Sequence, residues 1–215
     1  MATEIKYRIF RELQDYGAML AFQEKTRNEI LEGKYDGVIY FLEHDPVYTS
    51  GLRGTEDQFI KPLNGVPVYK IKRGGELTWH GPGQLVIYPV INIRKAGFAS
   101  IRDFVTYFGK AIEQVLTGHC KINNALWVEE KAGVWVDDRK IAFSGLHFKK
   151  FVPIHGYSLN IDPELSFFSS IIPCGIPDCK ITSIKAETGN KFNMYEISNE
   201  IVSVLKGKLP DLIEF

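Results

Sequence analysis

The chain has 215 residues, 45% of them hydrophobic and 24% charged, a composition that excludes a fibrous architecture and global disorder. It is long enough to bury a substantial core. Lysine and arginine number 26, as do aspartate and glutamate, so no basic surplus favours nucleic acid as a partner, and an acidic partner requires a local basic patch.

Hydrophobic periodicity and turn residues predict strands alternating with helices, without repeats. The predicted strands are 5–10, 38–42, 66–71, 85–93, 133–136, 140–148, 157–161 and a short one at 181–186. The predicted helices are 13–31, 101–116 and 194–205, followed by a tail. Pro89 predicts an edge strand or a strand end, because proline cannot donate to a ladder. The pattern indicates an α+β fold with a mixed sheet, as a single domain over 1–215.

Three cysteines, Cys120, Cys174 and Cys179, are too few and too scattered for a disulfide framework, which predicts a reducing compartment. No apolar run approaches the roughly 20 residues that span a bilayer. The first residues lack a secretory or transit pattern. We therefore expect a cytoplasmic protein with no membrane partner, although removal of a targeting segment would leave the same sequence.

The segment from Arg73 to Gln84 is rich in glycine and follows a predicted strand. Glycine allows the main chain to approach a ligand closely and to adopt positive φ. The segment lacks the spacing of a phosphate-binding GxxxxGK[ST] loop. Its composition favours a binding loop over a plain turn.

Two further residues gain interest only from their context. Lys140 lies where a turn meets a strand, and a lone lysine there is usually solvated. Cys174 lies between Pro173 and Gly175 in an apolar stretch, where a cysteine is more often inert than nucleophilic. Each residue taken alone therefore predicts no chemistry.

Taken together, the segments RGGxxTxHGPGQ, GVWVxxxKIAxxG, HGxxLN and PCG occur in this order from position 73 to position 175. This arrangement resembles the octanoyl-(acyl-carrier-protein):protein octanoyltransferase family, also called lipoyl(octanoyl) transferases. The resemblance begins near His44 and ends at Ile176. It implies the fold of the lipoate and biotin protein ligase catalytic domains, a mixed sheet flanked by helices.

The resemblance also implies the site. Cys174 would carry the acyl group as a thioester, and Lys140 would be its catalytic partner. The acyl site would be lined by Arg73, Gly74, Gly75, Glu76, Leu77, Thr78, Trp79, His80, Phe143, Ser144, Gly145, Gly156, Tyr157 and Ser158. His155 and His44 are expected to border it. Some residues differ from those that the family usually has at these positions: Trp79, Ser144, His147 and the pair Tyr157-Ser158. These differences affect the expected shape of the pocket.

The implied reaction passes an octanoyl or lipoyl group from the phosphopantetheine of acyl carrier protein to a lysine of a lipoyl domain, without a further cofactor. The acceptors would be 2-oxoacid dehydrogenase and glycine cleavage proteins, and the reaction would be the first step of endogenous lipoylation. A nearby ammonium favours the Cys174 thiolate, and a neutral Lys140 can accept the proton of the attacking amine. Because each buried methylene contributes about 0.8 kcal/mol, chain-length selection needs a pocket with a definite end. Leu77, Trp79 and Phe143 are candidates for that wall, or simply core residues.

Alternatives stay open at this point. His80 could replace Lys140 as the base, and an ATP-dependent lipoate-protein ligase or a non-catalytic binding module would share the fold. The five histidines and three cysteines show no metal-binding spacing, so no metal is expected. Cys120, Cys179, His119 and His147 are expected to have no chemical role. A monomer is the default, with a basic rim for acidic partners at Lys70, Lys72, Arg73 and Lys149-Lys150.

Overall fold

The computed structural model describes residues 5–61, 63, 65–176 and 179–215, and only the main chain of Cys174. The helices, with short 3-10 turns labelled η, are α1 (Tyr16–Leu31), η1 (Glu56–Gln58), α2 (Ile101–Gly118), η2 (Glu129–Lys131), η3 (Leu165–Ser170), η4 (Pro173–Gly175), α3 (Ile184–Thr188) and α4 (Met194–Leu205). The strands are β1 (Ile5–Ile9), β2 (Gly37–Leu42), β3 (Val47–Ser50), β4 (Val68–Lys70), β5 (Leu77–His80), β6 (Gln84–Ile91), β7 (Ala125–Val128), β8 (Gly133–Val136), β9 (Arg139–Lys149), β10 (Val152–Asn160), β11 (Lys180–Ile181) and β12 (Ile213–Glu214).

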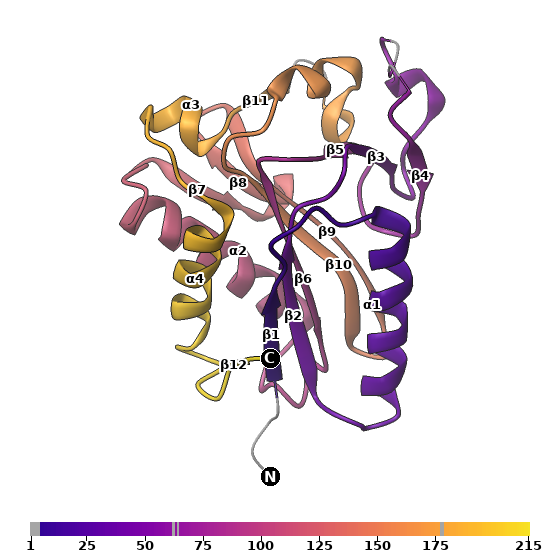
Figure 1. Cartoon of the computed structure of the whole chain (residues 1–215), viewed down its shortest axis with the longest axis vertical. Helices are drawn as coiled ribbons and strands as arrows, with labels where there is room; N and C mark the ends of the chain where they lie inside the picture. The colour runs from indigo at the N-terminus through magenta and orange to yellow at the C-terminus, as the bar shows by residue number, and fades with distance from the viewer. Residues whose placement is uncertain (1–4, 62, 64, 177–178) are drawn as a thin grey trace.

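The predicted mixed sheet is confirmed. The larger sheet has the order β12-β1-β2-β6-β10-β9-β8-β7, and β11 pairs with β9 off this path. The strand β1 is parallel to both β12 and β2, and β11 is parallel to β9, whereas the ladders from β2 across to β7 are antiparallel. A smaller sheet, β4-β3-β5, lies near one end of the larger one (Figure 1).

Helices cover both faces of the larger sheet, with α1 on one side and α2 and α4 on the other (Figure 1). The α2–α4 side holds the main apolar core, which includes Phe104, Phe108, Ile197 and Ile201. A third apolar cluster joins the smaller sheet to η3 and the residues after it; its members are Tyr48, Leu77, Trp79, Phe143, Phe168 and Ile171. No helix in the described ranges is both long enough and apolar enough to cross a membrane.

The helices begin where a polar side chain accepts a main-chain N–H of the first turn. Asp15 accepts from Ala18 at 2.7 Å, and Ser100 accepts from Asp103 at 3.0 Å. Asn193 caps α4 by accepting from the N–H of Glu196 at 2.8 Å. Such caps satisfy donors that the helix itself leaves without a partner. The predicted bounds of α4 are therefore met at both ends.

Of the two alternatives expected for Pro89, the edge strand is wrong, whereas its place near the end of a strand agrees with β6, which ends at Ile91. Pro89 lies within β6, which is a central strand, and pairs with Ile39 of β2. The ladder from β6 to β10 stops at Ile87, opposite Tyr157. Pro89 therefore lies beyond the end of this ladder, where β10 requires no N–H donor from β6. This explains why the strand tolerates a proline.

Three other segments also differ from the prediction. Only Ile181 of the expected strand 181–186 is in β11, because the Ser183 side chain accepts from the N–H of Ala186 and starts α3. The expected tail is not a tail, since Leu209 and Leu212 are buried and β12 extends the sheet. The glycine-rich segment, expected as a loop, also contains the strand β5.

Candidate active site

The glycine-rich segment is folded around the guanidinium of Arg73, which is buried. Its Nη2 donates to the main-chain carbonyls of Thr49 at 2.9 Å and Glu76 at 2.8 Å. The N–H of Gly74 donates to the carbonyl of Leu146 at 3.2 Å and so fixes the loop to β9. Arg73 thus fixes the conformation of this loop, because its guanidinium donates hydrogen bonds to main-chain carbonyls of the protein.

Strand β5 sends alternate side chains to opposite sides. Trp79 is buried in the third apolar cluster, where its ring stacks on Phe167 with centroids 4.8 Å apart. Thr78 and His80 instead line a cavity of about 460 Å³. Period-2 alternation therefore places Thr78 and His80 on the side away from Trp79, whereas Leu77 belongs to the third apolar cluster and also lines the cavity.

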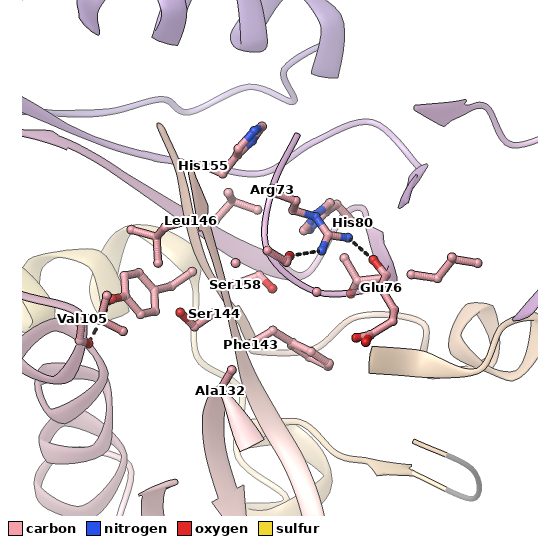
Figure 2. Close-up of a pocket in the computed structure, with 18 of the residues that line it drawn as sticks. Arg73, Glu76, His80, Val105, Ala132, Phe143, Ser144, Leu146, His155 and Ser158 are labelled. Atoms are coloured by element: carbon pink, nitrogen blue, oxygen red, sulfur yellow. Dashed lines mark hydrogen bonds between the residues drawn. The ribbon is translucent and has the colours of Figure 1, made fainter. Parts of the chain in front are cut away.

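The cavity brings together most of the predicted site (Figure 2). Of the residues expected there, it is lined by Arg73, Gly74, Gly75, Glu76, Leu77, Thr78, His80, Lys140, Phe143, Ser144, Gly145, His155, Gly156, Tyr157 and Ser158. Trp79 and His44 do not line it. The side chain of Cys174 lies outside the described part of the chain.

Sequence reasoning missed further cavity residues: Tyr16, Arg53, Val86, Tyr88, Val105, Glu130, Lys131, Ala132, Leu146, Phe148 and Ile176. Those on β9 had a detectable signal, because Leu146 and Phe148 continue the period-2 row that starts at Ser144. Tyr16 and Val105 had none, since each occupies an apolar helical position that is equally typical of core. Glu130 and Ala132 belong to a turn whose direction only the folded chain reveals.

The cavity reaches around an edge of β9. The ladder between β8 and β9 begins at the pair Gly133–Phe143, and the N–H of Ser144 then donates to the carbonyl of Ala132 at 2.9 Å. Beyond this point β8 no longer covers β9. Figure 2 shows Leu146 and Val105 on one side of this strand and Glu76 with Phe143 on the other. A ligand could therefore place a polar end under the glycine loop and an apolar end toward Val105.

Lys140 is buried to 1% exposure on β9. Its Nζ donates to the main-chain carbonyl of Lys131 at 2.9 Å and lies 5.0 Å from the ring centroid of Phe143. A Cβ at Gly133 would lie 2.5 Å from the Lys140 Cε and closer still to the carbonyl oxygen of Ala142. Gly133 therefore leaves the space that the lysine side chain occupies. Lys140 is therefore not a solvated turn residue, which is what a lone lysine at this position predicts.

The main chain that carries Cys174 approaches the same region. It forms η4, and the neighbouring Gly175 has φ +64° and lies against Glu76, whose Cγ would be 3.0 Å from an added Cβ. A few residues later, Ile181 of β11 pairs directly with Lys140. The fold thus brings the PCG segment to the glycine loop and then continues it alongside Lys140.

His80 belongs to a buried chain of hydrogen bonds. Its Nδ1 is 2.6 Å from Oε1 of Gln84, whose Nε2 donates to Oδ1 of Asn160 at 2.9 Å. Asn160 in turn donates to the carbonyl of Thr182, and the N–H of Thr182 donates to the carbonyl of Lys140. Because Gln84 uses its NH₂ group as donor, Nδ1 of His80 carries the proton and Nε2 keeps the lone pair. Burial lowers the pKa of His80 to about 3, so the ring is a weak base.

His44 and His155 are also buried and neutral. His44 Nδ1 donates to the carbonyl of Gln14 at 2.8 Å, and Nε2 accepts from the Tyr88 hydroxyl at 2.7 Å. Burial lowers the pKa of His44 to about 4. His44 therefore lies one residue behind the cavity wall, in contact with Tyr88, Tyr16 and His80, which line it. His155 lines the cavity directly, and burial, aided by Arg73, lowers its pKa to about 3.

Within the described ranges, no group of three or more His, Cys, Asp or Glu side chains is placed to hold a metal ion. The polar groups around the cavity are instead of mixed kinds: hydroxyl and main-chain groups, the imidazoles of His80 and His155, and charged side chains that include Lys140 and Glu76. Thr78 Oγ1 is buried there without a hydrogen-bond partner. This arrangement suits a ligand that has one polar reacting centre and a long apolar part.

The solved structures that resemble this chain share its fold. A putative lipoate protein ligase from T. acidophilum has a TM-score of 0.71 at 13% identity, covering 100% of this chain and 88% of that one. The biotin protein ligase of Aquifex aeolicus has a TM-score of 0.53 at 13% identity, covering 95% of this chain and 69% of that one. The expected fold, that of lipoate and biotin protein ligases, is confirmed.

Relatives at higher identity are octanoyltransferases. That of Wolbachia sp. subsp. Brugia malayi (strain TRS) is 35% identical over 199 residues, which are 91% of this chain and 95% of the relative. That of Mycolicibacterium smegmatis is 38% identical over 207 residues, which are 91% of this chain and 87% of the relative. Residues 15–206 match the family described as the lipoyl protein ligase A/B catalytic domain. The chain belongs to this family, as its sequence motifs led us to expect.

Proposed function

We propose that this chain transfers an octanoyl group from acyl carrier protein to a lysine of a lipoyl domain, through a thioester on Cys174 and with the help of Lys140. The octanoyltransferase relatives make it an acyltransferase of protein lipoylation. The observation that carries the proposal for the site is the buried ammonium of Lys140 on the wall of a cavity with an apolar end. A lysine that is only structural would have no reason to face that space.

The proposed chemistry has two exchanges. The Cys174 thiolate attacks the thioester carbonyl, and the phosphopantetheine sulfur leaves and takes up the proton that Lys140 gives up. The lysine amine of the lipoyl domain then attacks the new thioester, an amide forms, and the Cys174 sulfur leaves. A positively charged Lys140 favours the thiolate in the first exchange, and a neutral Lys140 accepts the amine's proton in the second. Neither exchange needs ATP or a cofactor.

His80 is the weaker candidate for the base. With a pKa lowered to about 3, it holds a proton too poorly to drive removal of one from an amine. Its Nε2 lone pair can still accept a hydrogen bond from a group in the cavity. This supports Lys140 as the proton acceptor and gives His80 a part in positioning.

The apolar end of the cavity suits the acyl chain. Val105, Leu146 and Phe148 line it on the far side of β9 from the glycine loop, together with the ring of Tyr157. The Tyr157 hydroxyl donates to the carbonyl of Val105 at 3.0 Å, which ties the strand to α2 (Figure 2). We propose that these residues, with Leu77 and Phe143, form the wall that selects chain length. Trp79 takes no part in it, since its ring packs behind β5.

The proposed protein partners are acyl carrier protein as donor and lipoyl domains as acceptors. Of the expected basic rim, Arg73 is buried and cannot belong to an exposed patch. Lys70, Lys72, Lys149 and Lys150 are exposed, and Lys70 pairs with Glu56 at 3.3 Å. A monomer in the cytoplasm remains our prediction.

Mass spectrometry tests the proposal. Purified protein is incubated with octanoyl carrier protein without ATP, and its intact mass is recorded before and after hydroxylamine treatment. We expect an octanoyl adduct that hydroxylamine removes and that is absent from Cys174→Ala. An ATP-dependent lipoate-protein ligase would instead form no adduct and would release pyrophosphate from octanoate and ATP.

A further inference from the structure

A second buried arginine, Arg27 of α1, differs from Arg73 in leaving part of its guanidinium unused. Arg27 is 7% exposed, and its Nε is buried without a hydrogen-bond partner. Its Nη1 lies 3.3 Å from Nδ1 of His147, and its Nη2 lies 4.0 Å from the carboxylate of Glu24. Glu24 is largely exposed, so its distant carboxylate only weakly compensates the buried charge. A buried guanidinium with a vacant donor is costly unless an anion completes it.

The surroundings of Arg27 are rich in positive charge. His147 of β9 faces both Arg27 and Lys72, and burial together with these two cations lowers its pKa. Lys72 is exposed at the start of the glycine loop, and among the described residues it makes no ion pair. The carboxylate of Glu24 acts against this lowering. The groups thus form a basic cluster between α1, β9 and the loop.

This basic cluster of Arg27, His147 and Lys72 adjoins the cavity through His155. This residue is buried, lines the cavity on the side of Arg73, and leaves its Nδ1 without a partner (Figure 2). Arg27 and His147 are close enough to contribute to the lowering of its pKa. His155 also has φ +60°, and its N–H donates to Oε1 of Gln23 on α1 at 2.7 Å. A non-glycine residue held at positive φ inside a strand is strained, and such strain is concentrated at functional sites.

From this geometry we infer an anion subsite, formed by Arg27, His147 and His155 with Lys72 at its rim, that binds the phosphate of the donor's phosphopantetheine arm. Arginine offers a planar pair of donors that suits phosphate oxygens, and both imidazoles can donate to an oxygen through one ring nitrogen. The pantetheine part of the arm would then enter the cavity past His155, and its thioester end would lie farther along the cavity. The inference rests on the proposed function, because it concerns the donor of that reaction.

Two small donors test it: octanoyl-pantetheine and octanoyl-4′-phosphopantetheine, which differ only by the phosphate. With a lipoyl domain as acceptor, we expect the wild-type kcat/KM to be at least about tenfold higher for the phosphorylated donor. Arg27→Gln and His147→Gln should bring the ratio of the two kcat/KM values close to one. Arg27→Lys, which keeps the charge without the planar pair of donors, should give an intermediate ratio.

The matched control is Lys25→Gln, which removes an exposed cation from the same helix and should leave the ratio at its wild-type value. Octanoyl carrier protein is the third donor, and an equal loss with it would show that the phosphodiester of the protein-bound arm is the group recognised. If Arg27→Gln does not fold, His147→Gln decides alone.

The inference is overturned if the wild-type ratio is close to one, if both variants keep the wild-type ratio, or if neither small donor reacts. Failure of the proposed function has a separate signature, the absence of a Cys174 adduct from octanoyl carrier protein.

Discussion

The helices on the two faces of the larger sheet differ in the polarity of the side chains that they bury. Helix α2 buries only apolar residues and glycine: Phe104, Phe108, Gly109, Ala111, Ile112, Val115 and Leu116. Helix α1 buries Gln23, Thr26 and Arg27 among its apolar residues. Gln23 and Thr26 have specific partners, the N–H of His155 and the hydroxyl of Tyr40. The α2 layer therefore stabilises the sheet by apolar burial. The α1 layer also buries polar side chains, which hold groups near the cavity in place.

The largest expected effect is on the α2 side. Phe108 is fully buried between Phe104 and Tyr157, and its ring stacks on Tyr157 with centroids 5.8 Å apart. Phe108→Ala should lower the free energy of unfolding by about 3–5 kcal/mol, because it removes a large apolar side chain and leaves a cavity. Urea unfolding measures this. Ile101→Ala, at a partly exposed position of the same helix, should cost far less, and equal costs would contradict the role of the α2 layer.

At Lys140 we expect loss of activity without loss of the fold. Lys140→Met keeps the length and the apolar stem of the side chain but removes the charge and the proton acceptor. Octanoyl transfer should fall by about a thousandfold, within the range typical of general acid–base groups, with a similar midpoint of thermal unfolding. Lys25→Met, at an exposed position of α1 outside the expected basic rim, is the control for lysine removal. Retention of activity in Lys140→Met would refute its catalytic assignment.

A smaller effect is expected from Gly133→Ala. The added methyl group meets Lys140 Cε and the carbonyl of Ala142, so the lysine must move away from its position on β9. We expect kcat to fall by about tenfold to a hundredfold, since displaced catalytic groups are costly. Gly118→Ala, at the end of α2 where nothing lies within 4 Å of the new methyl group, should leave kcat unchanged.

The buried histidines predict a pH dependence of stability. The folded-state pKa of His44 is lowered to about 4, below its ordinary value of 6.5, so the unfolded chain binds more protons between these values. The stability contributed by the neutral ring is full above pH 6.5 and is lost as the pH falls toward 4. The slope per group is at most about 1.4 kcal/mol per pH unit. His80 and His155, whose folded-state pKa values are lowered to about 3, act in the same direction.

Urea unfolding between pH 7.5 and 5 measures this slope. We expect His44→Gln to reduce it, because the variant has one fewer buried group to protonate. A wild-type protein whose stability does not change over this range would contradict the burial of neutral histidines on the α1 side.

Sequence reasoning recovered elements with strong local signals and missed those set by tertiary contacts. Helix α4 was predicted with its correct bounds because its apolar spacing and its cap at Asn193 agree. Strand β5 was missed because its four residues lie among glycines that predict a loop. The place of Pro89 depended on where the ladder between β10 and β6 ends, which no local pattern encodes.

The candidate site shows the same division. Motif order identified the segments that meet at the cavity, including Lys140, because each motif is local. It could not reveal that Trp79 faces away from the cavity, or that Tyr16 and Val105 from two different helices face it. It also gave Arg27 no significance, since a single arginine on a helix is usually solvated. Only its burial beside His147 distinguishes it.

The chain of hydrogen bonds from His80 to Lys140 has a consequence for local opening of the structure. The N–H of Thr182 donates to Lys140 while its carbonyl accepts from Asn160, so both sides of this residue are tied to the sheet. Its amide proton should therefore exchange with solvent as slowly as those of the central strands, although β11 is short and lies off the main path of the sheet. The PCG segment would then be anchored at its far end to one of the most slowly opening parts of the molecule.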